Sequence, residues 1–164
     1  MKTKLEKIIV AIGVPILVGS ISSGLVGNSR AAYAQLIQPE IAPPGWIFPI
    51  VWGILFVLMG IASYLIATSR ITTAHTTTAQ GEQVKEALTI YGVQLVVNFF
   101  WSIIFFRMER YLLAFLWIIL LWVLILKTIK AFYPISKVAA YLLIPYLLWV
   151  TFAGMLNLFI YFLN

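Results

Sequence analysis

The stretch PPGWIFPIVWGILFVLMG, residues 43–60, is the most informative part of this chain. It opens with two prolines and Trp46, and it then carries a further proline and a further tryptophan, Pro49 and Trp52, into an uncharged apolar run. A helix that only has to cross lipid needs neither residue, because proline removes a backbone donor and an indole N–H requires a partner. We therefore expect a membrane helix in which Trp52 faces a pocket for a flat ligand.

The composition extends this interpretation to the whole chain. Of the 164 residues, 63% are hydrophobic and 10% are charged, and the mean hydropathy is +1.03. Soluble domains contain about 45–50% apolar residues, so a water-soluble fold of this size could not bury so much apolar surface. The absence of cysteine excludes disulfides, thiolate metal sites and a cysteine nucleophile. The net charge of +6 does not indicate a nucleic-acid partner, because the basic residues lie singly or in pairs beside apolar runs.

Five apolar runs are long enough, or nearly so, for the ~20 residues that a helix needs to cross a bilayer. No strand-like alternation of apolar and polar residues is evident, so the prediction is an all-α membrane protein with a bundle of five transmembrane helices, forming one domain over residues 1–164. The predicted spans are residues 8–27, 46–67, 87–106, 111–129 and 138–163.

The first run raises the question of a signal peptide, because lysines precede it and the tripeptide Ala32-Tyr33-Ala34 follows it. Its apolar core exceeds the ~7–15 residues of a typical signal sequence. We expect the segment to remain as a membrane helix.

Lysine and arginine counts predict the orientation. Eight of these residues fall on the side of the N-terminus and of the loop 68–86, and three fall on the other side. The positive-inside rule then places the N-terminus in the cytoplasm and the C-terminus outside. On this prediction the loop 28–45 faces out, and the polar stretch TTAHTTTAQGEQ, residues 72–83, forms a flexible loop facing in.

Titratable residues argue against several kinds of chemistry. All five glutamates lie outside the apolar runs and there is no aspartate, which argues against a proton-coupled antiporter and against paired-carboxylate catalysis. The single histidine, His75, lies in a polar loop, where we expect it to be solvated. A metal site needs several convergent ligands, so we expect no metal ion and no cofactor.

Polar and aromatic residues instead follow helical spacing within the runs. Two interpretations remain open for them: hydrogen bonds between helices, and the lining of a pocket. The same choice, close packing or a pocket wall, applies to the small residues of the first run. The stripes are Gln94, Asn98, Trp101, Ser102 and Phe105 in the third run; Pro49, Trp52, Phe56 and Gly60 in the second; Pro145, Trp149, Phe152, Ala153 and Leu156, with Asn157 beside them, in the fifth; and Gly19, Ser23 and Gly27 in the first.

Taken together, these segments resemble the TspO/MBR family, the tryptophan-rich sensory proteins of bacteria and the translocator proteins of mitochondria. The resemblance is carried by PPGWIFPIVWG, GIASYL, QLVVNFFWSIIFF and IPYLLWVTFAGMLNLFIYFLN, and it covers essentially the whole chain. It implies a five-helix bundle whose cavity opens toward the first loop. It also implies binding of protoporphyrin IX or another tetrapyrrole, with light-dependent porphyrin breakdown in some members.

The resemblance also implies which residues form the site. The cavity tryptophans would be Trp52 and Trp149, which would also take part in any photochemistry. Tyr33 and Pro44 would cap the cavity from the first loop. The remaining lining residues implied in this way are Ser23, Phe56, Asn98, Trp101, Ser102, Phe105 and Ala153.

The expected function is a membrane receptor for tetrapyrroles, and the alternative is a facilitative transporter of porphyrins, sterols or other small amphipathic molecules. Tyr161 lacks the following basic residue of the cholesterol-associated pattern, which argues against sterol binding. The expected partners are protoporphyrin IX, the lipid bilayer and a second copy of the chain, since small residues favour close helix packing.

Overall fold

The computed structural model describes residues 3–69 and 78–164. Every regular element in these ranges is helical, and five helical segments are long and apolar enough to cross a membrane, which confirms the predicted class. His75 and the stretch 72–77 lie outside the described residues. The elements are α1 (Lys4–Val26), α2 (Ser29–Gln35), α3 (Ile47–Ser69), α4 (Thr78–Ser102), the π-helical turn η1 (Ile103–Arg107), α5 (Tyr111–Phe132), α6 (Lys137–Tyr141) and α7 (Ile144–Leu163).

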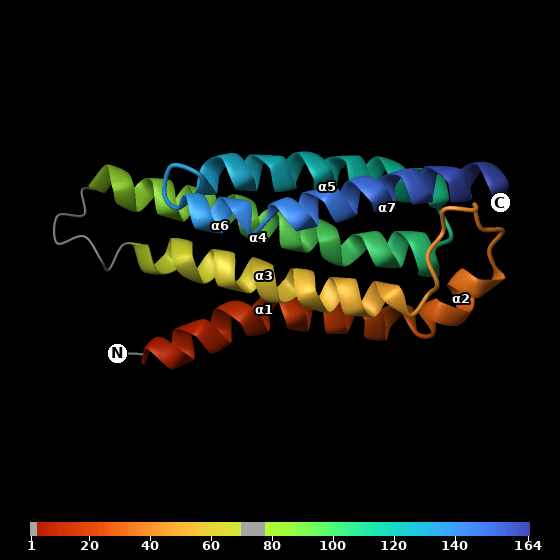
Figure 1. Ribbon diagram of the computed structural model, residues 1–164, viewed down its shortest axis with the longest axis horizontal. Helices are drawn as coiled ribbons and strands as arrows, with labels where there is room; N and C mark the ends of the chain where they lie inside the picture. The colour runs from red at the N-terminus through yellow and green to blue at the C-terminus, as the bar shows by residue number, and fades with distance from the viewer. Residues whose placement is uncertain (1–2, 70–77) are drawn as a thin grey trace.

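The helices form an elongated bundle with the long helices aligned along its axis (Figure 1). α1 packs mainly on α3 and also on α4, while α5 packs between α4 and α7. The N-terminus, the end of α3 and the start of α4 lie at one end of the bundle, and α2 and the C-terminus lie at the other (Figure 1).

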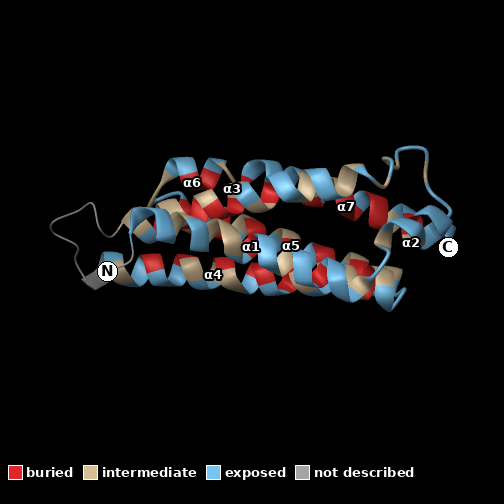
Figure 2. Cartoon of the chain, turned by 90° about the horizontal axis from the view of Figure 1, so that it is seen from below, coloured by how far each residue is buried: buried red, intermediate tan, exposed pale blue. Residues whose placement is uncertain are grey.

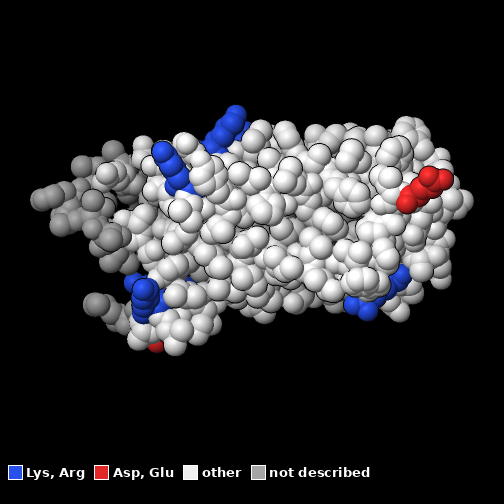
Figure 3. Space-filling view, viewed as in Figure 1, with Lys and Arg blue, Asp and Glu red and all other residues white. Residues whose placement is uncertain are grey.

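The pattern of buried and exposed residues is that of a protein surrounded by lipid rather than by water. Buried residues lie mainly on the faces between helices, whereas much of the outward surface is exposed (Figure 2). That outward surface includes many large apolar side chains, among them Leu17, Leu116 and Leu148 at 60%, 55% and 64% exposure. Charged side chains lie toward the two ends of the face seen in Figure 3, and the middle of that face is uncharged. This apolar belt is the lipid-facing surface.

The ends of α1 follow from local sequence. The Thr3 side chain accepts a hydrogen bond from the Glu6 backbone, and the Glu6 carboxylate accepts one from the Thr3 N–H, which together form a capping box. At the other end Gly27 adopts φ 77°, a conformation that only glycine reaches without steric cost.

Two of the prolines lie in the first turns of helices, where they do not interrupt the hydrogen bonding of a helix interior. Pro49 is the third residue of α3, where a backbone N–H has no partner within the helix, so it costs no hydrogen bond, contrary to our expectation. Pro145 lies in the first turn of α7 and divides the predicted span 138–163 into α6 and α7. Because proline cannot donate to the residue four positions back, the chain begins a new helix there.

Two further helical segments lie where we predicted loop. Residues 78–83, predicted as part of a flexible loop, form the first turns of α4. The predicted outer loop 28–45 contains α2. Asn28 caps the N-terminus of this helix, because its side-chain oxygen accepts a hydrogen bond from the Ala31 N–H. The rest of that loop is attached to the end of α7, because the Asn164 amide accepts from the Ile37 N–H and donates to the Ile37 carbonyl.

Candidate functional site: an aromatic cavity between α1, α3 and α4

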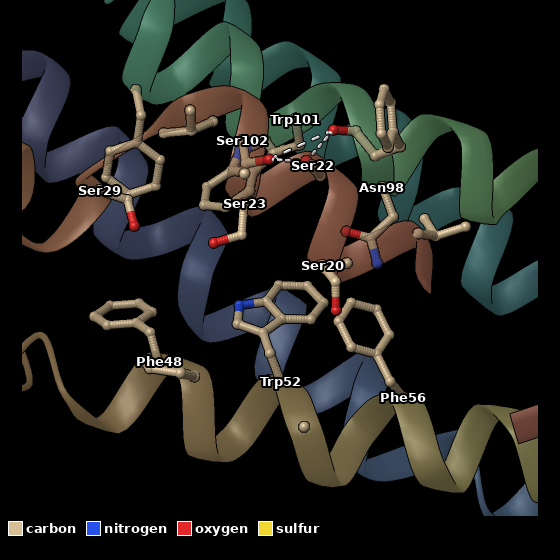
Figure 4. Close-up of a pocket in the computed structure, with 18 of the residues that line it drawn as sticks. Ser20, Ser22, Ser23, Ser29, Phe48, Trp52, Phe56, Asn98, Trp101 and Ser102 are labelled. Carbon is tan, nitrogen blue, oxygen red and sulfur yellow. Dashed lines mark hydrogen bonds between the residues drawn. The ribbon is translucent and has the colours of Figure 1, made fainter. Parts of the chain in front are cut away.

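A cavity of about 1100 Å³ lies between α1, α3 and α4 at the end of the bundle that carries α2 (Figure 4). Residues of α2 and of the turns around it line this end of the cavity, namely Asn28, Ser29, Arg30, Tyr33 and Gly45, and we call this end the mouth. Seven of the expected site residues line it: Ser23, Tyr33, Trp52, Phe56, Asn98, Trp101 and Ser102.

The wall formed by α3 is aromatic. Phe48, Trp52 and Phe56 follow one another at four-residue spacing and point into the cavity from one face of the helix (Figure 4). The Trp52 and Phe56 rings lie 5.5 Å apart, and Trp52 also meets the edge of Tyr146 at 6.1 Å. No described residue accepts a hydrogen bond from the indole N–H of Trp52, so this donor is available to a ligand.

The wall formed by α1 is built mainly of small residues, together with Ile16, Val18 and Val26. For the stripe of small residues in α1, close packing and a pocket wall were both open interpretations. All three residues of that stripe line the cavity: Gly19, Ser23 and Gly27. A side chain on Gly19 would come within 2.1 Å of the Phe56 ring, so the glycine makes room for an aromatic residue. The close approach of α1 to α3 occurs instead at Gly60, where an added Cβ would lie 2.4 Å from the Ile12 Cα.

The polar residues of the wall formed by α4 do both things that we left open: they take part in hydrogen bonds between helices, and they line the cavity. Ser22 of α1 donates to the Phe99 carbonyl at 2.7 Å and lies in hydrogen-bond contact with Ser102, which joins the two helices. The indole of Trp101 donates to the Asn157 Oδ1 at 3.3 Å, which joins α4 to α7. Asn98, Trp101 and Ser102 nevertheless also contribute to the cavity surface (Figure 4).

The mouth carries the only charged side chain among the lining residues of the described chain, the exposed Arg30. Beside it the buried Tyr33 donates from its hydroxyl to the Pro43 carbonyl at 3.3 Å, while Gln38 donates to the Tyr33 carbonyl at 2.7 Å. Burial raises the pKa of Tyr33 above its usual value, so this hydroxyl remains a neutral donor.

Four expected site residues lie outside the cavity lining: Pro44, Phe105, Trp149 and Ala153. Pro44 is exposed, and Phe105 is buried against Trp101 with the rings 5.4 Å apart. Trp149 lies behind Phe48, whose ring meets it edge-on at 5.8 Å. The indole N–H of Trp149 is enclosed without a hydrogen-bond partner among the described residues.

Phe48 is the lining residue that our sequence reasoning missed most plainly. It stands four positions before Trp52, so helical spacing alone could have placed both on one face. The other lining residues that we did not predict as site residues include Ser20, Ser22, Ser29, Phe99 and Phe106.

The sequence profile of the TspO/MBR family matches residues 11–163, which is nearly the entire chain. The chain belongs to the TspO/MBR family. The match spans all five membrane helices and therefore includes the cavity. Family membership and the five helices together identify an integral, multi-pass membrane protein.

Individual relatives within the TspO/MBR family come from bacteria, archaea and animals. The chain is 39% identical to the tryptophan-rich protein TspO of Chlorobaculum tepidum over 80% of its own length and 78% of the relative's. It is 33% identical to the protein of the same name from Archaeoglobus fulgidus over 96% and 97% of the two lengths. It is 37% identical to the translocator protein of Bos taurus over 80% and 73%.

Proposed function

We propose that this protein is a membrane receptor for tetrapyrroles, with protoporphyrin IX as the reference ligand, and that the cavity between α1, α3 and α4 is the binding site. The observation that carries the proposal is the aromatic face of Phe48 and Trp52 in a cavity that the small residues Ser23 and Gly27 also line, while Phe56 fills the space beside Gly19. Such a slot suits a flat ring system, because aromatic faces gain stacking energy and glycines let the ring approach the backbone.

The volume and the polarity of the cavity support the same ligand class. The volume of about 1100 Å³ slightly exceeds the range of about 300–1,000 Å³ that is typical of small-molecule pockets, so the cavity has room for a large ring system. Arg30 at the mouth suits the carboxylates of a porphyrin, since guanidinium–carboxylate pairs form strong, charge-assisted hydrogen bonds. The ring would then lie deep in the bundle with its acidic edge toward the loop.

Titration of protoporphyrin IX against tryptophan fluorescence tests the proposal. We expect saturable quenching in the native protein and an affinity about two- to tenfold lower in Trp52→Phe, because the substitution removes the indole N–H and part of the ring area, and one hydrogen bond contributes about 0.5–1.5 kcal/mol. Trp46→Phe is the matched control, since Trp46 is 58% exposed and lies outside the lining. Absence of saturable quenching, or equal affinities in the two variants, would contradict the proposal.

We extend the proposal to light-dependent breakdown of the bound porphyrin, with dioxygen as the oxidant. Trp52 lies on the cavity surface, whereas Trp149 contacts the lining residue Phe48 but is not itself in the lining, so of the two tryptophans expected to take part we assign the larger role to Trp52. Illumination of the complex with product analysis tests this. We expect decay to be faster than that of free porphyrin and slower again in Trp52→Phe; decay no faster than free porphyrin would reject the activity.

Facilitative transport is the second candidate, and exposed lining residues favour it. Ser20 of α1 and Gly53 and Val57 of α3 line the cavity and are exposed, so the cavity is accessible from outside the bundle rather than enclosed. A ligand could then exchange with the bilayer. Porphyrin flux into liposomes that contain the protein tests transport; flux equal to that of empty liposomes would leave the receptor as the function.

Two further proposals concern the whole assembly. The charge distribution supports a cytoplasmic N-terminus and a cavity mouth on the outer side, because the lysine-rich termini of α1, α4 and α5 contrast with the few arginines near α2.

The homodimer stays a prediction, and the small-residue stripe on which it rested lines the cavity.

A further inference from the structure

A buried chain of hydrogen bonds reaches the deep part of the cavity from behind. The Asn98 Nδ2 donates to the Tyr146 hydroxyl at 3.0 Å, and that hydroxyl donates to the Gln94 Oε1 at 2.9 Å. Tyr146 and Gln94 are each 1% exposed and lie outside the cavity lining, while Asn98 lines the cavity. The chain therefore connects a cavity residue to two residues that no ligand touches.

The direction of this chain is set by Gln94, whose Oε1 faces the Tyr146 hydroxyl. A tyrosine hydroxyl has one proton to donate, and an unpaired acceptor in the interior is destabilising. Donation to Gln94 satisfies an oxygen that water cannot reach. Tyr146 must then accept, rather than donate, in its contact with Asn98, so the NH2 group of Asn98 is turned toward it.

The carbonyl oxygen of the Asn98 amide is therefore directed away from Tyr146. No described residue donates to the Asn98 Oδ1, and this atom is not among the enclosed polar atoms that lack a partner. Figure 4 shows the Asn98 side chain on α4 pointing toward the cavity side of Trp52 and Phe56 on α3. The deep part of the cavity thus offers a carbonyl oxygen, which is an acceptor only.

The polar groups nearer the mouth are hydrogen-bond donors, in contrast to the acceptor at Asn98. The Trp52 N–H has no acceptor among the described residues, and Arg30 has only donors. The cavity consequently offers donors toward α2 and an acceptor at Asn98.

We infer that the Gln94–Tyr146–Asn98 chain sets the ligand selectivity of the cavity: Asn98 accepts a hydrogen bond from an N–H or O–H group on the deep edge of a flat ligand, and Tyr146 and Gln94 are positioning residues that hold the amide in this orientation. The inference rests on the proposed function, because it requires that the cavity bind a ligand. It goes beyond that function by naming the polarity that the deep edge of the ligand must have.

The test uses two flat probes of nearly identical shape, carbazole, which has an edge N–H, and dibenzofuran, which has an edge oxygen. Their dissociation constants are measured by calorimetry on the full chain in lipid nanodiscs, with empty nanodiscs as the blank. We expect carbazole to bind about tenfold more tightly, because its N–H pairs with the Asn98 carbonyl, whereas the ether oxygen of dibenzofuran leaves that carbonyl unpaired. Equal affinities, or a preference for dibenzofuran, would overturn the inference.

Tyr146→Phe separates positioning from packing. It removes one hydroxyl, keeps the ring that packs on Trp52, and alters no lining atom. We expect the carbazole preference to fall to about twofold or less, because the Asn98 amide can then turn over. Tyr91→Phe is the matched control, since the Tyr91 hydroxyl is also buried but lies outside this chain, and it should keep the tenfold preference.

Gln94→Leu provides a second route should Tyr146→Phe fold poorly. With no acceptor at Gln94, the Tyr146 hydroxyl is free to donate to Asn98, which turns the NH2 group toward the cavity and should also abolish the preference. An undiminished preference in either folded variant would overturn the role of the chain. If neither probe binds and protoporphyrin IX fails to quench, the binding cavity itself is contradicted, whereas equal binding of both probes contradicts the selectivity alone.

Discussion

At the scale of single residues, the glycines of this chain serve different purposes that sequence spacing does not separate. Gly19 and Gly60 both lie in apolar helices, yet one leaves space for the Phe56 ring and the other lets the backbone of α1 touch α3. The spacing placed Gly60 on the same face as Trp52 and Phe56. It could not tell that this face changes from cavity to helix contact within one turn.

Gly60→Ala should destabilise the bundle. The new Cβ would lie 2.4 Å from the Ile12 Cα and 2.8 Å from the Ala11 oxygen, both of them backbone atoms that cannot rotate away. We expect a loss of about 1–3 kcal/mol, as for other overpacked sites, measured as a lower thermal midpoint in detergent or nanodiscs. Gly24→Ala is the control, because nothing lies within 4 Å of its added Cβ. A midpoint equal to that of the control would show that α1 and α3 do not approach this closely.

Gly19→Ala should narrow the cavity rather than unfold the protein. Its Cβ would meet only the far end of the Phe56 ring, which can turn into the cavity. We expect weaker binding of protoporphyrin IX by fluorescence titration with little change in thermal midpoint. Gly13→Ala also adds a methyl group to a glycine of α1 with nothing within 4 Å of its added Cβ, but outside the cavity lining, so it should bind as the native protein does. The reverse order of affinities would contradict the proposed wall.

At the scale of helices, the contact between α1 and α4 depends on a polar bond at a point where α4 changes its winding. The Ser22 hydroxyl reaches the Phe99 carbonyl just before the π-helical turn η1, and the Arg107 guanidinium at the end of that turn donates to the Leu25 carbonyl at 3.0 Å. Side-chain donors of this kind satisfy carbonyls that an irregular helix or a helix end leaves free.

Ser22→Ala should therefore weaken the bundle by about 1 kcal/mol, the typical net contribution of a hydrogen bond, since its hydroxyl is buried and paired. Ser23→Ala removes an exposed hydroxyl from the next residue and should leave the thermal midpoint unchanged. Equal midpoints for the two variants would mean that the bond to Phe99 does not hold α1 in place.

At the scale of the whole molecule, the charge distribution predicts which end of the bundle lies in the cytoplasm. Because the native chain has no cysteine, a single introduced cysteine is a unique label. We expect Glu40→Cys, in the loop beyond α2, to react in intact cells with a maleimide that cannot cross membranes. Glu82→Cys, in the first turns of α4, should react only after the cells are opened. The opposite labelling pattern would reverse the proposed orientation and would place the cavity mouth in the cytoplasm.

The sequence by itself determined the class of the molecule and the residue types of its site. Apolar runs of bilayer length can satisfy their backbone only as helices, so five runs meant five membrane helices. Helical spacing also placed Trp52 and Phe56 on one face, and Asn98, Trp101 and Ser102 on another, because side chains three and four positions apart share a face. These inferences need only local geometry and the properties of lipid.

Only the tertiary structure decided what each face meets, because that depends on the rotation and separation of helices distant in sequence. It placed Phe48 on the cavity surface and left Trp149 outside the lining, in contact with Phe48, and it turned the small residues of α1 toward the cavity. It also set the orientation of the Asn98 amide through Tyr146, a residue 48 positions away. A hydrogen bond between two such residues has no local signal in the sequence, since it exists only after the helices have packed.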